Sequence, residues 1–112
     1  MTNEDALNLI FIISDNIDYE VNNNLVTVLE KQNHTIQNFF RRLKFKIPNY
    51  KKIELDKYSS FVFLQIDGKK TVEEIGFNLE KAYGDDSHPL YERLLVFLNH
   101  IEGNCKYIER VN

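Results

Sequence analysis

The largest concentration of charge in this chain is a basic segment at residues 41–52. It holds six Lys or Arg residues and no Asp or Glu, although the whole chain has a formal net charge of -3. Such cations can bind an acidic peptide, an acidic surface of a partner protein or nucleic-acid phosphates, and exposed lysines also protect a strand edge from aggregation. We treat the first four as a candidate partner-binding patch. The six residues are Arg41, Arg42, Lys44, Lys46, Lys51 and Lys52.

Aromatic residues interleave with these cations, as they do in proteins that stack single-stranded bases. Phe39, Phe40, Phe45 and Tyr50 have this arrangement, which is equally typical of a short amphipathic segment that packs on a core. The acidic net charge disfavours a duplex-DNA binder. A helix that reads the major groove offers basic or amide side chains, whereas residues 89–102 contain Arg93 as their single Lys or Arg. The sequence therefore favours a protein or peptide partner over nucleic acid.

Residues that could catalyse a reaction or hold a metal are few and poorly spaced. His88 and His100 are twelve residues apart, so a helix turns them about 120° away from each other. His34 belongs to a different segment. Cys105 is the single cysteine, which excludes an intrachain disulfide and is typical of a reducing compartment. No catalytic partner lies near it in the sequence, so we expect an unreactive thiol, no metal site, no cofactor and no enzymatic activity.

Three helices in the C-terminal half must position the candidate residues. The periodicity of apolar residues predicts them at residues 57–66, 72–83 and 89–102. Asp67-Gly68 is a turn dipeptide, and Thr71 followed by Glu74 is a capping box for the second helix. These signals predict two helices joined by a tight turn.

Glycine and apolar stripes indicate how these helices pack. Gly84 and Gly103 are expected to end the second and third helices. Gly76 lies inside the second helix, where it costs about 1 kcal/mol relative to alanine and so indicates the close approach of a neighbouring helix. The stripes predict one shared core that contains Phe61, Val62, Ile66, Ile75, Leu79, Leu94, Phe97 and Leu98.

The N-terminal half is expected to be rich in β-structure. Residues 17–21 and 25–29 are separated by three asparagines and predict a hairpin. Residues 51–55 predict a third short strand, and Asp56 follows at the N-cap position of the first helix. Between them, a short helix at about residues 36–43 is ended by Pro48.

The apolar run at residues 9–13 is too short for a membrane span and lacks the flanks of a signal peptide. We therefore expect a cytoplasmic protein with no membrane partner. The run either packs as a strand on its own sheet or drives a homodimer, and we expect the dimer.

The turn and cap residues carry a resemblance to a known family. Ile66, Asp67-Gly68, Lys69-Lys70 and residues 71–75 (Thr-Val-Glu-Glu-Ile) have the order seen in the PqqD family, named for pyrroloquinoline-quinone synthesis protein D. Leu55-Asp56, Tyr83-Gly84 and Phe97-Leu98 also resemble it. The resemblance covers about the C-terminal two thirds of the chain, and the long Asn-rich and basic middle departs from the compact family form.

The resemblance implies a winged helix-turn-helix-like α+β domain in which a three-stranded antiparallel β region precedes three helices. We expect one domain over residues 1–112, with an N-terminal arm or strand at 1–16, the β region at 17–55 and the helices and tail at 56–112. Family members hold the leader of a precursor peptide and present it to a modifying enzyme, often a radical-SAM protein. The expected function is thus a non-enzymatic peptide adaptor. A regulatory or structural interaction domain is the alternative, followed by a winged-helix nucleic-acid binder.

The expected binding site is the groove between the third strand and the third helix. An edge strand there can pair with an extended guest peptide, whose alternate side chains enter the gap beside the helix. The strand residues are Lys52, Ile53, Glu54 and Leu55. The helix residues are Tyr91, Leu94, Leu95 and Leu98, for which plain core packing is the alternative.

Overall fold

The computed structural model of the protein describes residues 3–31 and 50–112. In chain order its elements are α1 (Asn3–Leu7), β1 (Phe11–Ile13), β2 (Asp18–Asn22), β3 (Leu25–Lys31), β4 (Tyr50–Glu54), α3 (Lys57–Gln65), α4 (Val72–Tyr83), η1 (Gly84–Ser87), α5 (Leu90–Asn99), η2 (His100–Asn104) and β5 (Ile108–Arg110). The fold is therefore mixed α+β, with antiparallel strands. The short helix expected at 36–43 and the candidate patch of Arg41, Arg42, Lys44 and Lys46 lie outside the described residues. No described helix combines the length and the apolar character that a bilayer span requires.

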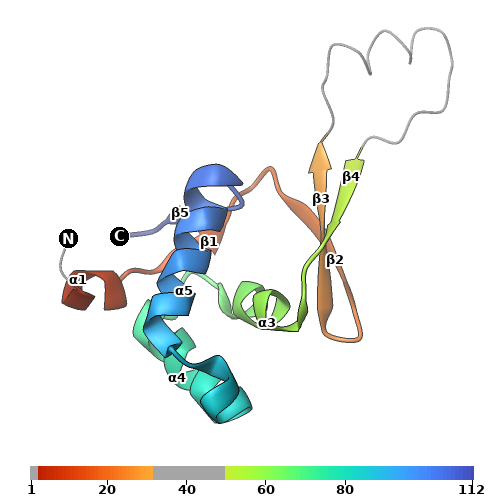
Figure 1. Cartoon of the computed structure of the whole chain (residues 1–112). Helices are drawn as coiled ribbons and strands as arrows, with labels where there is room; N and C mark the ends of the chain where they lie inside the picture. The colour runs from red at the N-terminus through yellow and green to blue at the C-terminus, as the bar shows by residue number, and fades with distance from the viewer. Residues whose placement is uncertain (1–2, 32–49) are drawn as a thin grey trace, which may run out of the picture.

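The expected hairpin and third strand form a three-stranded antiparallel sheet in the order β2-β3-β4. Asn23 and Asn24 have positive φ values of 53° and 66°, which asparagine tolerates better than most residues and which a two-residue hairpin turn requires. Val26 and Val28 of β3 are fully buried beneath α3. Figure 1 shows the sheet on one side of the molecule, with α3 between it and α5.

The helix caps lie where the sequence places them. Asp56 accepts a hydrogen bond from the Ser59 amide and starts α3. Thr71 and Glu74 form the reciprocal capping box of α4, and Gly84, with φ of 55°, follows the last residue of that helix. Since these caps satisfy amide groups that the helix itself leaves unpaired, local chemistry determines both helix starts.

Tertiary contacts decide the end of the third helix. The sequence predicts an end at Gly103, but the helix continues as the π-helical turn η2, which includes this glycine. The Cys105 amide donates to the His100 carbonyl, and the Tyr107 amide donates to the Ile101 carbonyl. The chain after the helix thus satisfies the last carbonyls, so no glycine cap is needed.

The apolar run at residues 9–13 is used within the chain. Its strand β1 pairs antiparallel with β5 near the C-terminus, and Phe11 lies opposite Arg110. On its other side, the Gly68 amide donates to the Phe11 carbonyl, and the Val72 amide donates to the Leu9 carbonyl. The run therefore forms a strand, which was one of the two alternatives. This strand belongs to a separate two-stranded sheet. The cover that we expected from a second copy comes from the chain itself, while the oligomeric state stays a prediction.

One core joins the sheet to the helices. Six of the eight predicted core residues are buried, whereas Phe61 and Phe97 are partly buried and pack at its margin. The reason is that α3 and α5 each carry apolar residues on more than one face, and only one face of each turns inward. Residues that the prediction missed include Phe63 and Tyr107, and Tyr107 follows from the unexpected C-terminal contacts.

Gly76 of α4 lies against the ring of Tyr91 of α5. A Cβ atom placed there would lie 2.3 Å from Cε1 of Tyr91. We therefore expect Gly76→Ala to lower the free energy of unfolding by about 1 to 2 kcal/mol, because overpacking outweighs the gain in helix propensity. Urea denaturation would measure it. Gly103→Ala is the matched control, since a Cβ there meets nothing within 4 Å. A Gly76→Ala variant as stable as the parent would contradict the packing described.

Candidate functional site

Strand β4 presents an open edge. It pairs with β3 on one side only among the described strands. The Leu55 amide donates to the Val26 carbonyl. Hydrogen-bonded pairs alternate along an antiparallel ladder, so Ile53 also bonds inward, to Val28 opposite it. The backbone amide and carbonyl groups of Lys52 and Glu54 consequently point outward, where a guest strand could meet them.

The same alternation sorts the four predicted strand residues by face. Ile53 lies on the face of the sheet that covers the core, because its cross-strand partner Val28 is buried there. Leu55 follows on this face and is likewise partly buried. Lys52 and Glu54 lie on the opposite face and are exposed. The structure thus brings the predicted strand residues together, with the backbone of Lys52 and Glu54 accessible and the side chains of the other two turned inward.

The predicted helix residues do not line the expected groove between strand and helix. Leu94 and Leu98 are at most 1% exposed and belong to the core, and Leu95 packs against it. Tyr91 turns toward α4, where its hydroxyl donates to the Glu73 carbonyl at 3.1 Å. The core-packing alternative therefore describes these residues, because the strongest apolar stripe of α5 is the one that the core takes.

A second stripe of α5 lines an open cavity of about 520 Å³. Tyr58 of α3 lies on its wall, with the Arg93 guanidinium 4.3 Å from the centre of its ring. Phe97 meets the same ring edge-to-face at 6.3 Å between centroids, and Val96 is 69% exposed. Prediction from sequence missed this stripe. Its signal was the helical spacing of Pro89, Glu92, Arg93, Val96, Phe97 and His100.

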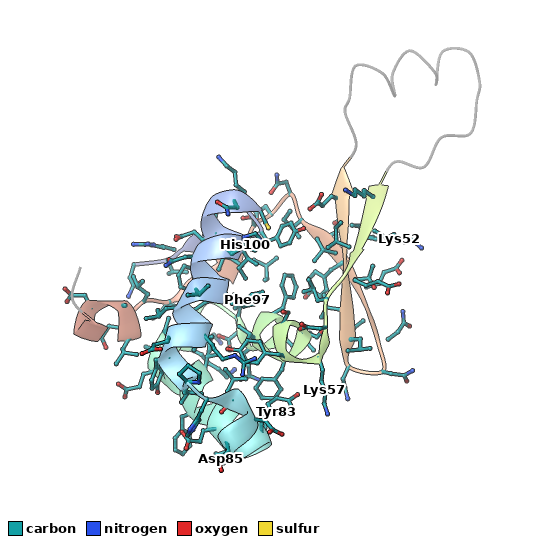
Figure 2. The ribbon with its side chains drawn as sticks, in the orientation of Figure 1. Lys52, Lys57, Tyr83, Asp85, Phe97 and His100 are labelled. Carbon is teal, nitrogen blue, oxygen red and sulfur yellow. The ribbon has the colours of Figure 1, made fainter. Side chains whose placement is uncertain are left out.

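One polar atom in this cavity lacks a partner. The Tyr58 hydroxyl is buried and makes no hydrogen bond within the described part of the chain. Burial raises the pKa of this phenol, and the charge of Arg93 offsets part of the rise, so the group remains a neutral donor near pH 7. An unpaired buried hydroxyl costs free energy, and because its oxygen has almost no accessible surface, it is the ring of Tyr58, and not this atom, that a ligand in the cavity would meet. Figure 2 shows Phe97 on α5 and His100 at the start of η2, with Lys52 on β4 beyond α3.

A contact between cysteine and histidine also escaped the sequence analysis. The Cys105 sulfur lies 3.4 Å from Nε2 of His100, while the Asn104 side-chain amide lies 3.1 Å from Nδ1 of the same ring. Residues five apart do not meet on an α-helix, but the π-helical turn η2 brings them together. Burial and the negative charge of Glu30 raise the pKa of the Cys105 thiol. The raised pKa favours the protonated thiol near pH 7, while the reactivity of Cys105 stays a prediction.

Two features of the described residues could meet a partner here, namely the outward backbone of β4 and the α5 cavity. Comparison of the chain with protein-family models, with curated proteins and with solved structures found no match.

Proposed function

We propose that this protein is a PqqD-like winged-helix module that binds the leader of a ribosomally made precursor peptide by strand addition. In this proposal it performs no chemistry itself and presents the peptide to a modifying enzyme, such as a radical-SAM maturase. The observation that carries the proposal is the open edge of β4, where Lys52 and Glu54 turn their backbone groups outward. The sheet followed by three helices supports the winged-helix class, with β2 and β3 as the wing.

Strand physics describes how the peptide would be held. Main-chain hydrogen bonds to β4 supply affinity that does not depend on the guest sequence, and side-chain pockets supply selectivity. Alternate guest residues would point to the core-side face of the sheet, the face that Ile53 shares. The α5 cavity offers them Val96, Phe97 and the ring of Tyr58. The guest residues between them would lie beside Lys52 and Glu54 on the opposite face.

The basic segment has a separate role in this proposal. Arg41, Arg42, Lys44 and Lys46 would bind an acidic surface of the modifying enzyme or an acidic part of the leader. Their charges act over about 8 Å at physiological salt, so they would steer association and set its dependence on ionic strength.

Proline at an outward position of β4 tests strand addition. Lys52→Pro removes an amide that faces a guest but no amide of the β3–β4 ladder, so it should weaken leader binding by about tenfold or more while the domain stays folded. The measurement is calorimetric titration of the full chain with the leader of the precursor peptide encoded beside its gene. Amide signals of residues 51–55 should shift on binding in the parent.

The matched control is Val21→Pro on β2, the other edge of the sheet. Two-residue hairpins close on a hydrogen-bonded pair, here Asn22 and Leu25, so Val21 also faces outward. Its substitution should leave the affinity unchanged. An equal loss of leader affinity in the two variants would show that β4 is not the binding site. Tight binding of duplex DNA that survives physiological salt would favour the nucleic-acid alternative instead.

A further inference from the structure

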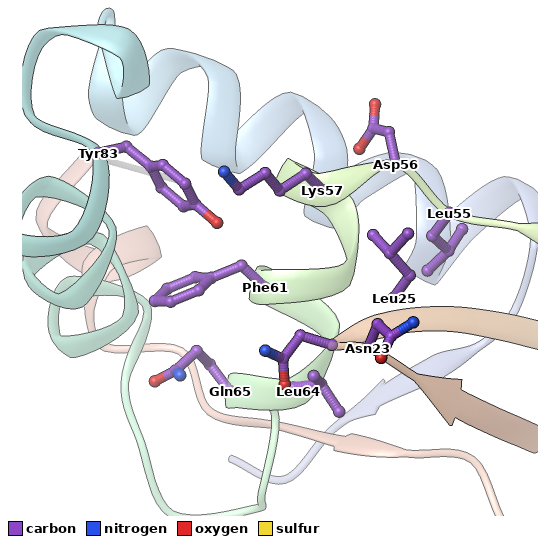
Figure 3. A pocket seen from close by; sticks show the side chains of 10 residues that line it. Asn23, Leu25, Leu55, Asp56, Lys57, Phe61, Leu64, Gln65 and Tyr83 are labelled. Atoms are coloured by element: carbon purple, nitrogen blue, oxygen red, sulfur yellow. The ribbon is translucent and has the colours of Figure 1, made fainter.

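A larger cavity, of about 720 Å³, lies at the point where β4 ends and α3 begins. Figure 3 shows it between the turn of the β2–β3 hairpin, one face of α3 and the end of α4. Its volume lies within the range of about 300 to 1,000 Å³ that ligand sites occupy. No part of the function proposed above uses it.

The floor of this cavity is apolar. Phe61 and Tyr83 meet edge-to-face at 5.4 Å between centroids, and Leu25 and Leu64 are 45% and 41% exposed. Leu55 completes the floor. The α3 helix buries Val62 and Phe63 on its other side; the face toward the cavity is thus a second apolar surface that the domain leaves open.

The rim is polar and carries one cation, Lys57, and one carboxylate, Asp56, which accepts a hydrogen bond from the Ser59 amide at the start of α3. The Lys57 ammonium lies 5.5 Å from the centre of the Tyr83 ring, and the ion pairs of the described residues do not include it. Asn23, Asn24 and Gln65 add side-chain amides, of which only the Gln65 oxygen has a described partner, the Asn78 amide at 2.9 Å. An amide both donates and accepts hydrogen bonds, as a peptide backbone requires.

We propose that this cavity binds a bulky apolar side chain of a peptide, with a carboxylate of the next residue placed on Lys57. The inference rests on the proposed peptide-binding function, and the occupant is a continuation of the guest that pairs with β4. Leu55, the residue after β4, lies on the cavity floor. Lys57 lines this cavity, while its neighbour Tyr58 lines the α5 cavity. A guest that runs past the end of β4 therefore meets this cavity at Leu55.

Short capped peptides test the cavity apart from the strand. The probes are acetyl-Gly-Phe-Glu-Gly-amide and its Gln counterpart, which are too short for a stable guest strand, titrated into the full chain and followed by amide and methyl NMR signals. Signals of Leu25, Phe61, Leu64 and Tyr83 should shift. The Glu probe should bind about two- to fivefold tighter than the Gln probe, as expected for an exposed ion pair.

Variants identify the groups responsible. Lys57→Gln should abolish the preference for Glu, and Leu64→Ser should weaken both probes. Lys81→Gln is the matched control, because its ammonium lies 5.4 Å from the Phe77 ring in a similar arrangement outside this cavity. This substitution should change neither the affinity for the two probes nor the preference for Glu.

Other occupants give different results, each of which would overturn the inference. A small-molecule site would bind 3-phenylpropionate as tightly as the Glu probe. A self-association site would give a dimer by light scattering that Leu64→Ser disperses. An undiminished Glu preference in Lys57→Gln would also contradict it.

Failure of strand addition at β4 and failure of the cavity proposal give different results. Lys52→Pro should weaken leader binding by about tenfold or more and leave the short probes unaffected. Leu64→Ser should weaken leader binding while the signals of residues 51–55 still shift. If the short probes fail and the leader still binds to β4, strand addition stands without the second cavity.

Discussion

Replacing Leu94 with alanine should lower the free energy of unfolding by about 2 to 5 kcal/mol, the range for deleting a fully buried leucine side chain. Leu94 is completely buried in the core between the helices and the sheet. Thermal and urea denaturation would measure the loss. Val96→Ala on the same helix is the control, since its side chain is 69% exposed and the change should stay within about 0.5 kcal/mol.

The same pair of positions separates core from binding surface. Folded Leu94→Ala protein should bind the leader peptide as the parent does, while Val96→Ser, in the wall of the α5 cavity, should weaken it several-fold. The opposite pattern, with a stable Leu94→Ala variant that no longer binds peptide, would restore the groove role that the sequence suggested for Leu94.

Replacing Tyr107 with phenylalanine should cost about 1.5 to 3 kcal/mol at neutral pH, the contribution of a hydrogen bond to a charged group. The Tyr107 hydroxyl donates to the Glu30 carboxylate and so ties the C-terminal segment to β3. Without it, the partly buried carboxylate loses its donor. Tyr91→Phe is the control, because its hydrogen bond to Glu73 is exposed and should contribute about 0.5 to 1.5 kcal/mol.

The Tyr107 variant should also change how stability depends on alkaline pH. Burial and the bond to Glu30 raise the pKa of Tyr107 in the folded protein. Above about pH 10 the unfolded chain releases this proton while the folded chain retains it. The unfolded state then binds fewer protons, so stability falls as the pH rises, by up to about 1.4 kcal/mol per pH unit.

Tyr107→Phe should remove that part of the slope. Urea denaturation between pH 9 and 11, about one unit either side of the ordinary pKa of tyrosine, would compare the two proteins. Parallel slopes would mean that Tyr107 ionises in the folded protein as easily as in the unfolded chain.

Local chemistry made most of the secondary structure predictable. Asp56 and the pair Thr71 and Glu74 satisfy helix amides within three residues of themselves, and Asn23-Asn24 supplies the positive φ that the hairpin needs. These interactions involve neighbours in the chain, so the sequence alone determined the hairpin, the starts of α3 and α4 and the end of α4.

The choice between faces depended on tertiary structure. The α5 helix has two apolar stripes; the core took Leu94 and Leu98, as their spacing predicted, and left Val96 exposed. The residues of this helix that a guest peptide could reach are therefore not the predicted Leu94 and Leu98. Likewise, the ladder of β3 with β4 decided that Lys52, and not Ile53, turns its amide outward.

Long-range pairing was beyond the reach of the sequence. Strand β1 meets β5 almost a hundred residues later, because Phe11 needs cover that its own neighbours cannot supply. The π-helical turn brings Cys105 to His100 at a spacing that an α-helix keeps apart. The sequence by itself determined which segments become helices and strands, while burial of the remaining apolar faces, which no local signal encodes, decided how the two ends of the chain meet and which residues stay open to a partner.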